Sequence, residues 1–343
     1  MKEIFKDTFV LESGETLPGI EIAYHTYGTL NARRTNCIWV CHALTANSDV
    51  ADWWPHTVEQ GRFLDPDKYF IVCANIIGSC YGSTGPLTVD PETGEPRYGD
   101  FPRLTIRDMV RAHILLADRL GLDSMAALIG SSVGGFQAVE WAVMQPHRFR
   151  SLVLIATDAY ASPWTVACDE TQRMAITSDS TWGERRADAA QSGLAAARAI
   201  GMLTYRGASG YNRTQQDPVL DDISVWQPRR AVTYQRHQGR KLVNRFDAYS
   251  YMTILNAFDT HDVGRNRGGR REALSRLSMP VIVVSITTDI IFTAKEMQHL
   301  AQMIPNASYE EIESDFGHDG FLVEHEKLNS ILKDFIDNNN TNI

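Results

Sequence analysis

The chain has 343 residues, 43% of them hydrophobic, which is enough for one large core with an inserted subdomain. Its formal net charge is −9, and basic residues adjoin only in short patches such as Arg229-Arg230 and Arg270-Arg271. This balance argues against nucleic acid or an anionic membrane as the main partner. No stretch approaches the roughly 18 consecutive apolar residues that a membrane span needs.

The cysteines and the first residues bear on the compartment. The five cysteines form no CxxC pair, and Cys37 and Cys41 lie in one predicted strand, so we expect thiols in a reducing environment. Residues 1–7 lack the continuous apolar run of a secretory signal. We therefore expect a cytoplasmic protein.

The first half of the chain alternates strand-like and helix-like patterns. Residues 15–28 predict antiparallel strands, and a helix with apolar residues at helical spacing is expected from Thr105 to Leu120. Short apolar runs predict buried strands at Cys37–Cys41, Tyr69–Ala74, Ala126–Ile129 and Ser151–Ile155. The order predicts an α/β protein with a mostly parallel, doubly wound sheet and an antiparallel edge.

A Gly-x-Ser-x-Gly motif occupies residues 130–134, between a predicted strand and a helical segment at 136–142. Its glycines permit a turn too sharp for residues with a Cβ, and this context is typical of a nucleophile elbow. Ser131 is an adjacent hydroxyl, but only Ser132 has a glycine two residues away on each side. We predict that Ser132 is a nucleophile and that the Val133 N–H faces the anion that its attack creates; a plain turn is the alternative.

Strand patterns disappear between residues 161 and 270, where helical segments rich in Arg, Gln and Ala replace them. Helices are predicted at Cys168–Thr177, Glu184–Leu203 and Trp226–Lys241. We predict that residues 161–270 form a helical lid, inserted into a core made of residues 1–160 and 271–343.

A nucleophilic serine needs a base, and the base needs an acid to orient it. In an elbow architecture these partners follow the serine in the order acid, histidine. The strand pattern resumes at Pro280–Ile286 and is followed by Asp289, while the strand Ser308–Glu313 leads into a loop with His318. We predict that Asp289 is the acid and His318 the base, although a surface aspartate also commonly ends a strand.

The other nine histidines are weaker candidates. His42 follows a predicted strand, so we expect it near the site without being the base. His261 adjoins Asp262, but no second histidine lies three or four residues away, so we expect no metal site. The remaining seven lie in amphipathic or polar segments, where a solvated or packed imidazole is expected.

Several motifs together resemble the homoserine O-acyltransferases of methionine biosynthesis, a family with the α/β-hydrolase fold. The matching segments are His42-Ala43-Leu44-Thr45, Gly82-Ser83-Thr84-Gly85-Pro86, Phe101-Pro102, the elbow, Gly193-Leu194-x-x-Ala197-Arg198, Thr204-Tyr205-Arg206, Arg245-Phe246-Asp247-Ala248-x-Ser250-Tyr251 and Gly317-His318-Asp319-x-Phe321-Leu322. The last four together are specific to this family. The chain departs from the family pattern at Ala46, Ser131 and Val133, and since Val133 contributes its N–H, the departures concern the acyl pocket rather than the mechanism.

The resemblance implies acyl transfer through an acyl-serine. Ser132 would attack the thioester of acetyl-CoA, and His318 would then deprotonate the hydroxyl of homoserine. The oxyanion hole would combine the N–H groups of Val133 and Leu44. Acetyl-CoA would then be a co-substrate, and no resident cofactor is implied. The resemblance also implies a homodimer formed through the lid helices.

The acceptor is a zwitterion, so it needs a cation and an anion in the site. Arg198 and Tyr205 are seven residues apart and project to one helix face; by resemblance they bind the carboxylate, and Asp319 binds the ammonium. Without the resemblance, a solvated position on the helix face is the preferred interpretation of Arg198. The alternative role for Asp319 is that of a loop cap.

Three classes of function compete on this evidence. The first is the homoserine acyltransferase, with acetyl or succinyl as the donor group and homoserine or serine as the acceptor. The second is an esterase or lipase with the same triad under a polar lid. The third, a non-catalytic binding protein, is disfavoured because all three triad members are present.

Overall fold

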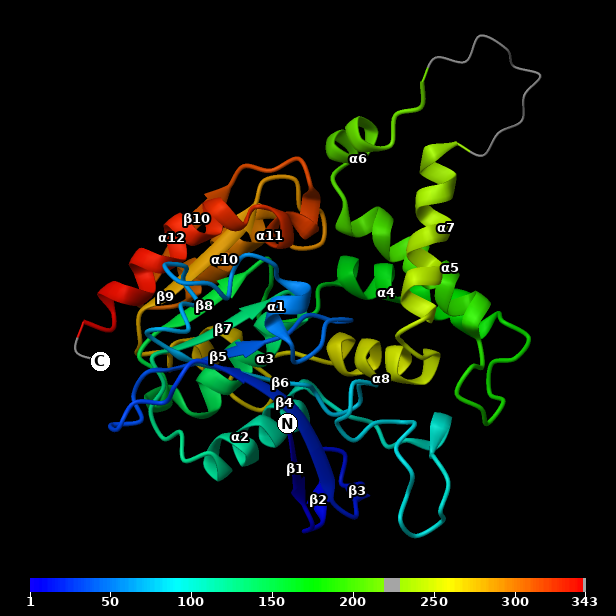
Figure 1. The fold of residues 1–343 in the computed structure, drawn as a ribbon, viewed down its shortest axis with the longest axis horizontal. Helices are drawn as coiled ribbons and strands as arrows, with labels where there is room; N and C mark the ends of the chain where they lie inside the picture. Colours follow the sequence, from blue (N-terminus) through cyan, green and yellow to red (C-terminus); the bar gives the residue numbers. More distant parts are fainter. Residues whose placement is uncertain (219–228, 342–343) are drawn as a thin grey trace.

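Buried apolar strands form the centre of an eight-stranded sheet in the computed structural model, which describes residues 1–218 and 229–341 (Figure 1). The strand order is β1 (Lys2–Phe5), β4 (Ile20–Tyr27), β6 (Phe70–Ala74), β5 (Cys37–Cys41), β7 (Ala127–Ser131), β8 (Leu152–Ile155), β9 (Val281–Ile286) and β10 (Ala307–Ile312). From β6 to β10 all pairs are parallel, whereas β4 pairs antiparallel with β1 and β6. The predicted α/β class with an antiparallel edge is confirmed. The short strands β2 (Phe9–Val10) and β3 (Thr16–Leu17) form a separate pair.

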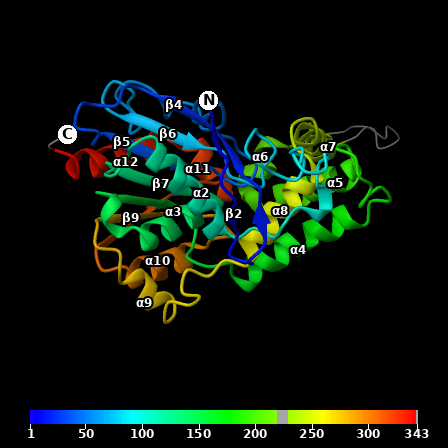
Figure 2. The same cartoon turned by 90° about the horizontal axis from the view of Figure 1, so that it is seen from below.

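Alternate residues of the central strands face two hydrophobic clusters, one on each side of the sheet. On β5, Trp39 belongs to the cluster beneath α2 (Ile106–Arg119), α3 (Val133–Met144), α9 (Arg270–Leu274) and α10 (Ala294–Met303). Its neighbours Ile38 and Val40 belong to the cluster with α1 (Val50–Trp53), α11 (Gly320–Val323) and α12 (His325–Asn338). Figure 2 shows α3, α9 and α10 on one side of the strands. Because both faces are covered, the strands read as continuous apolar runs.

The described chain between β8 and α9 is mostly helical and lies to the right of the sheet in Figure 1. Its helices are α4 (Pro163–Thr177), α5 (Gln191–Tyr205), α6 (Ala208–Thr214), α7 (Arg230–Val243) and α8 (Ala248–Asp259). We keep the term lid for this segment, and its division from the core at residues 161 and 270 remains a prediction. Among the described residues, no helix is long and apolar enough to cross a membrane.

Two predicted helix starts in the lid are wrong, and a third cannot be compared with the described structure. Helix α4 begins five residues before Cys168, at Pro163, because Ser162 caps it by accepting a hydrogen bond from the Thr165 N–H (3.2 Å). Helix α5 begins at Gln191 instead of Glu184, because Ala190 adopts a left-handed conformation (φ 55°) that interrupts the helix. The start predicted at Trp226 lies outside the described residues, and α7 begins at Arg230.

Candidate active site

Ser132 stands at the turn between β7 and α3, with φ 53° and ψ −129°. This conformation is strained for a residue with a side chain and is typical of a nucleophile elbow. The turn needs its glycines because of close approach: a Cβ on Gly130 would lie 2.2 Å from the Gly134 carbonyl oxygen, and one on Gly134 would lie 2.0 Å from the Cys41 carbonyl oxygen. Ser131 belongs to β7, and its hydroxyl is buried without a hydrogen-bond partner in the described structure.

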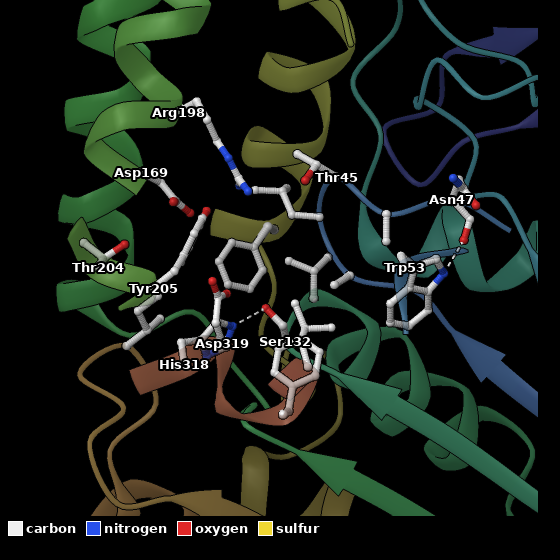
Figure 3. A pocket seen from close by; sticks show the side chains of 18 of the residues that line it. Thr45, Asn47, Trp53, Ser132, Asp169, Arg198, Thr204, Tyr205, His318 and Asp319 are labelled. Carbon is white, nitrogen blue, oxygen red and sulfur yellow. Dashed lines mark hydrogen bonds between the residues drawn. The ribbon is translucent and has the colours of Figure 1, made fainter. Parts of the chain in front are cut away.

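The structure brings the three residues of the predicted triad together. His318 Nε2 lies 2.9 Å from Ser132 Oγ, and His318 Nδ1 lies 2.7 Å from Asp289 Oδ2 (Figure 3). Asp289 follows β9, and its Oδ1 accepts hydrogen bonds from the N–H groups of Ile291 (2.8 Å) and Phe292 (3.1 Å). The carboxylate is thus held from both sides. The geometry is that of a serine activated by an oriented imidazole.

Opposing effects act on the His318 imidazole. Burial lowers the pKa of His318, while the charge of Asp289 and the hydrogen bond to it raise it more, so the pKa lies above its ordinary value of 6.5. The neighbouring charge of Asp319 acts in the same direction as Asp289. An imidazolium formed here during proton transfer is therefore stabilised.

The two backbone groups predicted to bind an oxyanion both line the cavity at Ser132. Val133 is the first residue of α3, and Leu44 lies in the loop after β5. Within residues 1–218 and 229–341, neither N–H donates a hydrogen bond to a protein acceptor. A helix begins with N–H groups that lack intrahelical partners, and such groups attract anions.

His42 organises the loop that carries Leu44. Its Nε2 accepts a hydrogen bond from the Ile76 N–H (3.1 Å), and its Nδ1 donates to the Ala43 carbonyl (2.9 Å). Burial lowers the pKa of His42 to about 4, so the ring is neutral near pH 7. The prediction that His42 lies near the site without being the base is consistent with these contacts, because both ring nitrogens are occupied.

Ser132 lines a cavity of about 610 Å³ between the sheet and the lid helices. Figure 3 shows Arg198, Tyr205 and Asp169 of the lid on one side of Ser132, and Trp53 and Asn47 on the other. Its walls combine apolar side chains with polar and charged ones. Such a mixture suits a substrate with an apolar part and a few fixed polar groups.

The predicted acceptor residues all line this cavity. The Arg198 guanidinium lies 5.5 Å from the centre of the Tyr205 ring, so the two share one helix face as predicted. Asp319, beside His318, forms an ion pair with Arg206 (2.9 Å), a contact that the sequence did not reveal. Burial raises the pKa of Asp319, although Arg206 and Arg198 oppose that shift.

Four charged residues at the cavity were not predicted: Asp52, Asp169, Lys241 and Arg245. Arg245 donates hydrogen bonds to the Thr45 carbonyl (2.5 Å) and to the Tyr81 hydroxyl. Its place in the motif at residues 245–251 was a signal, since that motif is one of the four that together are specific to the family. No sequence signal marked Asp169, because it lies inside an ordinary helical pattern.

His261 is buried, with its ring centre 5.4 Å from that of Phe136. In the part of the chain that the structure describes, no three His, Cys, Asp or Glu side chains are grouped as metal ligands. The five cysteines are free thiols.

The fold and the Ser–His–Asp geometry define the class of protein. A family model described as the alpha/beta hydrolase fold matches residues 37–325. Among solved structures, homoserine O-acetyltransferase from Bacillus anthracis superposes with a TM-score of 0.90 at 24% identity, covering 98% of this chain and 96% of that one. Esterase E22 superposes with a TM-score of 0.88 at 22% identity, covering 98% and 99%. At these identities the likeness concerns the fold, which transferases and esterases share.

A relative identified by its sequence distinguishes between the transferases and the esterases that share this fold. The chain is 44% identical over 343 residues to the homoserine O-acetyltransferase of Cyclobacterium marinum, covering 99% of this chain and 96% of that protein. The chain belongs to the homoserine O-acetyltransferase family of the α/β-hydrolase fold.

Proposed function

We propose that the protein transfers an acetyl group from acetyl-CoA to the hydroxyl of L-homoserine through an acetyl-Ser132 intermediate, giving O-acetyl-L-homoserine for methionine biosynthesis. The observation that carries this proposal is that a serine–histidine–aspartate arrangement and the cation Arg198 share one cavity. The name of the relative supports both the acetyl group and homoserine.

In the first half-reaction, Ser132 Oγ attacks the thioester carbonyl while His318 Nε2 takes its proton. The carbonyl oxygen becomes an anion, which the N–H groups of Val133 and Leu44 are placed to bind. When the tetrahedral species collapses, the carbon–sulfur bond breaks, and the CoA thiolate leaves and takes the proton from His318. The product is acetyl-Ser132.

In the second half-reaction, His318 takes the proton of the homoserine hydroxyl as its oxygen attacks the acetyl carbonyl. The same N–H groups bind the second oxyanion, and collapse returns the serine oxygen with the proton from His318. Arg198 and Tyr205 bind the acceptor carboxylate, and Asp319 binds its ammonium. Among the described residues, Arg198 has no carboxylate partner within ion-pair distance, so the guanidinium is available to a ligand.

An esterase is the competing reading, because it needs the same triad but no acceptor subsite. A cation in a cavity costs desolvation unless an anion meets it, which favours a substrate with a carboxylate. Succinyl as the donor group and serine as the acceptor are further alternatives on the same scaffold.

The oligomeric state and the cellular location belong to the same proposal. Met174, Leu203 and Val232 are large apolar residues exposed on α4, α5 and α7, which supports a homodimer formed through the lid helices. Sedimentation that shows a monomer at micromolar concentration would remove the dimer without affecting the chemistry. A cytoplasmic location and the lack of a resident cofactor complete the proposal.

A steady-state assay that crosses acetyl-CoA and succinyl-CoA with homoserine and serine tests the function. We expect acetyl-CoA with homoserine to be the best pair, with parallel double-reciprocal lines and an acetylated Ser132 peptide when acceptor is withheld. Ser132→Ala should lose thiol release by a factor on the order of 10⁶, whereas Ser131→Ala should not. Intersecting lines without an acetylated peptide would mean direct transfer, and hydrolysis that homoserine does not outcompete would mean an esterase.

A further inference from the structure

The backbone of Ser132 is held by residues at the end of the neighbouring strand, β8. The Ser132 N–H donates a hydrogen bond to the Ile155 carbonyl (3.0 Å). The Ser132 carbonyl accepts hydrogen bonds from the Thr157 hydroxyl (2.7 Å) and from the Gly135 N–H (2.9 Å). Thr157 is fully buried and lies two residues after the end of β8. A side chain from another part of the sheet therefore binds the carbonyl of the nucleophile.

This carbonyl shares a peptide plane with one N–H of the predicted oxyanion hole. The oxygen belongs to Ser132 and the N–H to Val133, and in a trans peptide the two groups point in opposite directions within one rigid plane. A hydrogen bond that fixes the direction of the oxygen therefore also fixes the direction of the N–H. The same bond polarises the amide, which makes its N–H a stronger donor.

The turn directly before Thr157 is strained and anchored. Ala156 has a left-handed backbone conformation (φ 46°), which is unfavourable for a residue with a Cβ. Its N–H donates to the Val284 carbonyl of β9 (2.9 Å), so the turn is tied to the sheet. Such conformations persist only where surrounding contacts hold them, and they cluster at functional sites.

Helix α3 leaves room for the Thr157 side chain at Gly135. A Cβ on Gly135 would lie 2.4 Å from both Oγ1 and Cγ2 of Thr157, so a larger residue there would displace the hydroxyl from the Ser132 carbonyl. Glycine is unfavourable inside a helix relative to alanine. The contact between Thr157 and the elbow gives a physical reason for this glycine.

We propose that Thr157 is a positioning residue of the oxyanion hole, whose hydroxyl orients and polarises the Ser132–Val133 peptide so that the Val133 N–H faces the oxyanion. This inference rests on the proposed function, in which an oxyanion forms on the acetyl group once in each half-reaction. Because Thr157 is fully buried, it acts through the peptide and not by contact with a substrate. Loss of the hydroxyl should therefore slow both half-reactions by a similar factor and leave substrate binding unchanged.

Thr157→Val and Thr157→Ser test the inference together, because valine keeps the shape of the side chain without a donor and serine keeps the donor. Removing a whole oxyanion donor lowers kcat on the order of 10²–10³, and a donor that is only less well aimed should cost less, about tenfold. In Thr157→Val we expect kcat and the single-turnover rate of thiol release without acceptor to fall about tenfold, while the KM for homoserine stays within about twofold. Thr157→Ser should retain both rates within about threefold, and a serine variant as slow as the valine variant would contradict a role for the hydroxyl.

Ser151→Ala is the matched control. Ser151 directly precedes β8, at the end opposite Thr157, and its buried hydroxyl donates to the Ala126 carbonyl directly before β7 (2.9 Å). It joins the same two segments of the sheet through the same kind of hydrogen bond, but far from the elbow. We expect Ser151→Ala to keep both half-reactions within about twofold of wild type. Thr157→Val with rates equal to those of this control would overturn the inference.

A donor with a poorer oxyanion acceptor separates the oxyanion hole from the nucleophile. In dithioacetyl-CoA, sulfur replaces the carbonyl oxygen, and sulfur is a weak hydrogen-bond acceptor. With this donor, Thr157→Val should release thiol within about twofold of the wild-type rate, because the Val133 N–H contributes little to the reaction. A tenfold slowing with both donors would mean that Thr157 positions the Ser132 hydroxyl instead, and would overturn the inference. Should Thr157→Val fail to fold, Thr157→Ala should show the same dependence on the donor.

The outcomes distinguish this inference from the function on which it rests. Wild type that releases thiol from acetyl-CoA but transfers no acetyl group to homoserine refutes the proposed function. Wild type that forms O-acetyl-L-homoserine, with Thr157→Val as fast as Ser151→Ala, refutes only the positioning role.

Discussion

Asp289→Asn provides a sharp test of the triad, because the structure determines how the new amide must point. Asp289 Oδ1 accepts the N–H groups of Ile291 and Phe292, while Oδ2 faces His318 Nδ1 at 2.7 Å. In the variant, the amide oxygen keeps the two backbone donors, so the NH₂ group is turned toward His318. Nδ1 must then accept a hydrogen bond, and the ring proton moves to Nε2. In that tautomer Nε2 has no lone pair for the proton of Ser132.

The expected loss is large. Replacing the acid of a Ser-His-Asp triad by its amide lowers kcat by about 10⁴, which corresponds to about 5.4 kcal/mol of transition-state stabilisation. Burial leaves little room for another outcome, since both His318 and Asp289 are 4% exposed and water cannot easily replace the carboxylate.

The assay is thiol release from acetyl-CoA in a single turnover without acceptor, which isolates the step that needs His318 as a base. Asp315→Asn is the control, because Asp315 lies on the same loop as His318 but pairs with Arg213 and is half exposed. We expect the control to match wild type within about twofold. An Asp289→Asn enzyme within tenfold of wild type would refute the assignment of the acid.

Three further predictions follow from charges in the site and the lid. Arg198→Ala removes a charge-assisted hydrogen bond worth about 1.5–3 kcal/mol, so kcat/KM for homoserine should fall tenfold to more than a hundredfold while thiol release without acceptor is unchanged. Arg236→Ala, on the exposed side of α7, is the control and should leave both rates unchanged, and equal loss of both half-reactions in Arg198→Ala would make Arg198 structural. Since His318 must be neutral to act as a base and its pKa is raised, the acid limb of the acetylation rate should be centred above pH 6.5, and a limb at lower pH would contradict the effect of Asp289. Burial and the charge of Asp259 raise the pKa of Asp169, so the folded state binds its proton more tightly than the unfolded state, and wild type loses stability as the pH rises above 3.8. In urea unfolding, the stability of Asp169→Asn relative to wild type should therefore be greater at pH 8 than at pH 5, and a stability difference that does not change with pH would contradict the raised pKa.

Local sequence determined the sheet and the positions of the triad candidates. Cys37–Cys41 is apolar throughout and Pro280–Ile286 is apolar apart from Ser285, because both faces of the sheet are covered, and the structure has strands at both. The elbow is readable because its glycines are required within a few residues of Ser132, where close backbone approach leaves no room for a Cβ. Asp289 and His318 are readable because each follows a strand that ends at the same edge of the sheet.

Tertiary structure decided the contacts between segments that are distant in the chain. The Arg206–Asp319 ion pair joins the end of α5 to the loop with His318. The hydrogen bond from the Tyr251 hydroxyl to Gln172, which in turn donates to Asp169, joins α8 to α4. No spacing marks these pairs, because helical patterns show which face is apolar but not which polar side chain meets a partner from another helix. The start of α5 was missed for a related reason: the turn before it is held by Asp179, whose carboxylate accepts the Gly193 N–H (2.9 Å). Side-chain hydrogen bonds of this kind depend on where the backbone has already been placed, so only the folded chain reveals them.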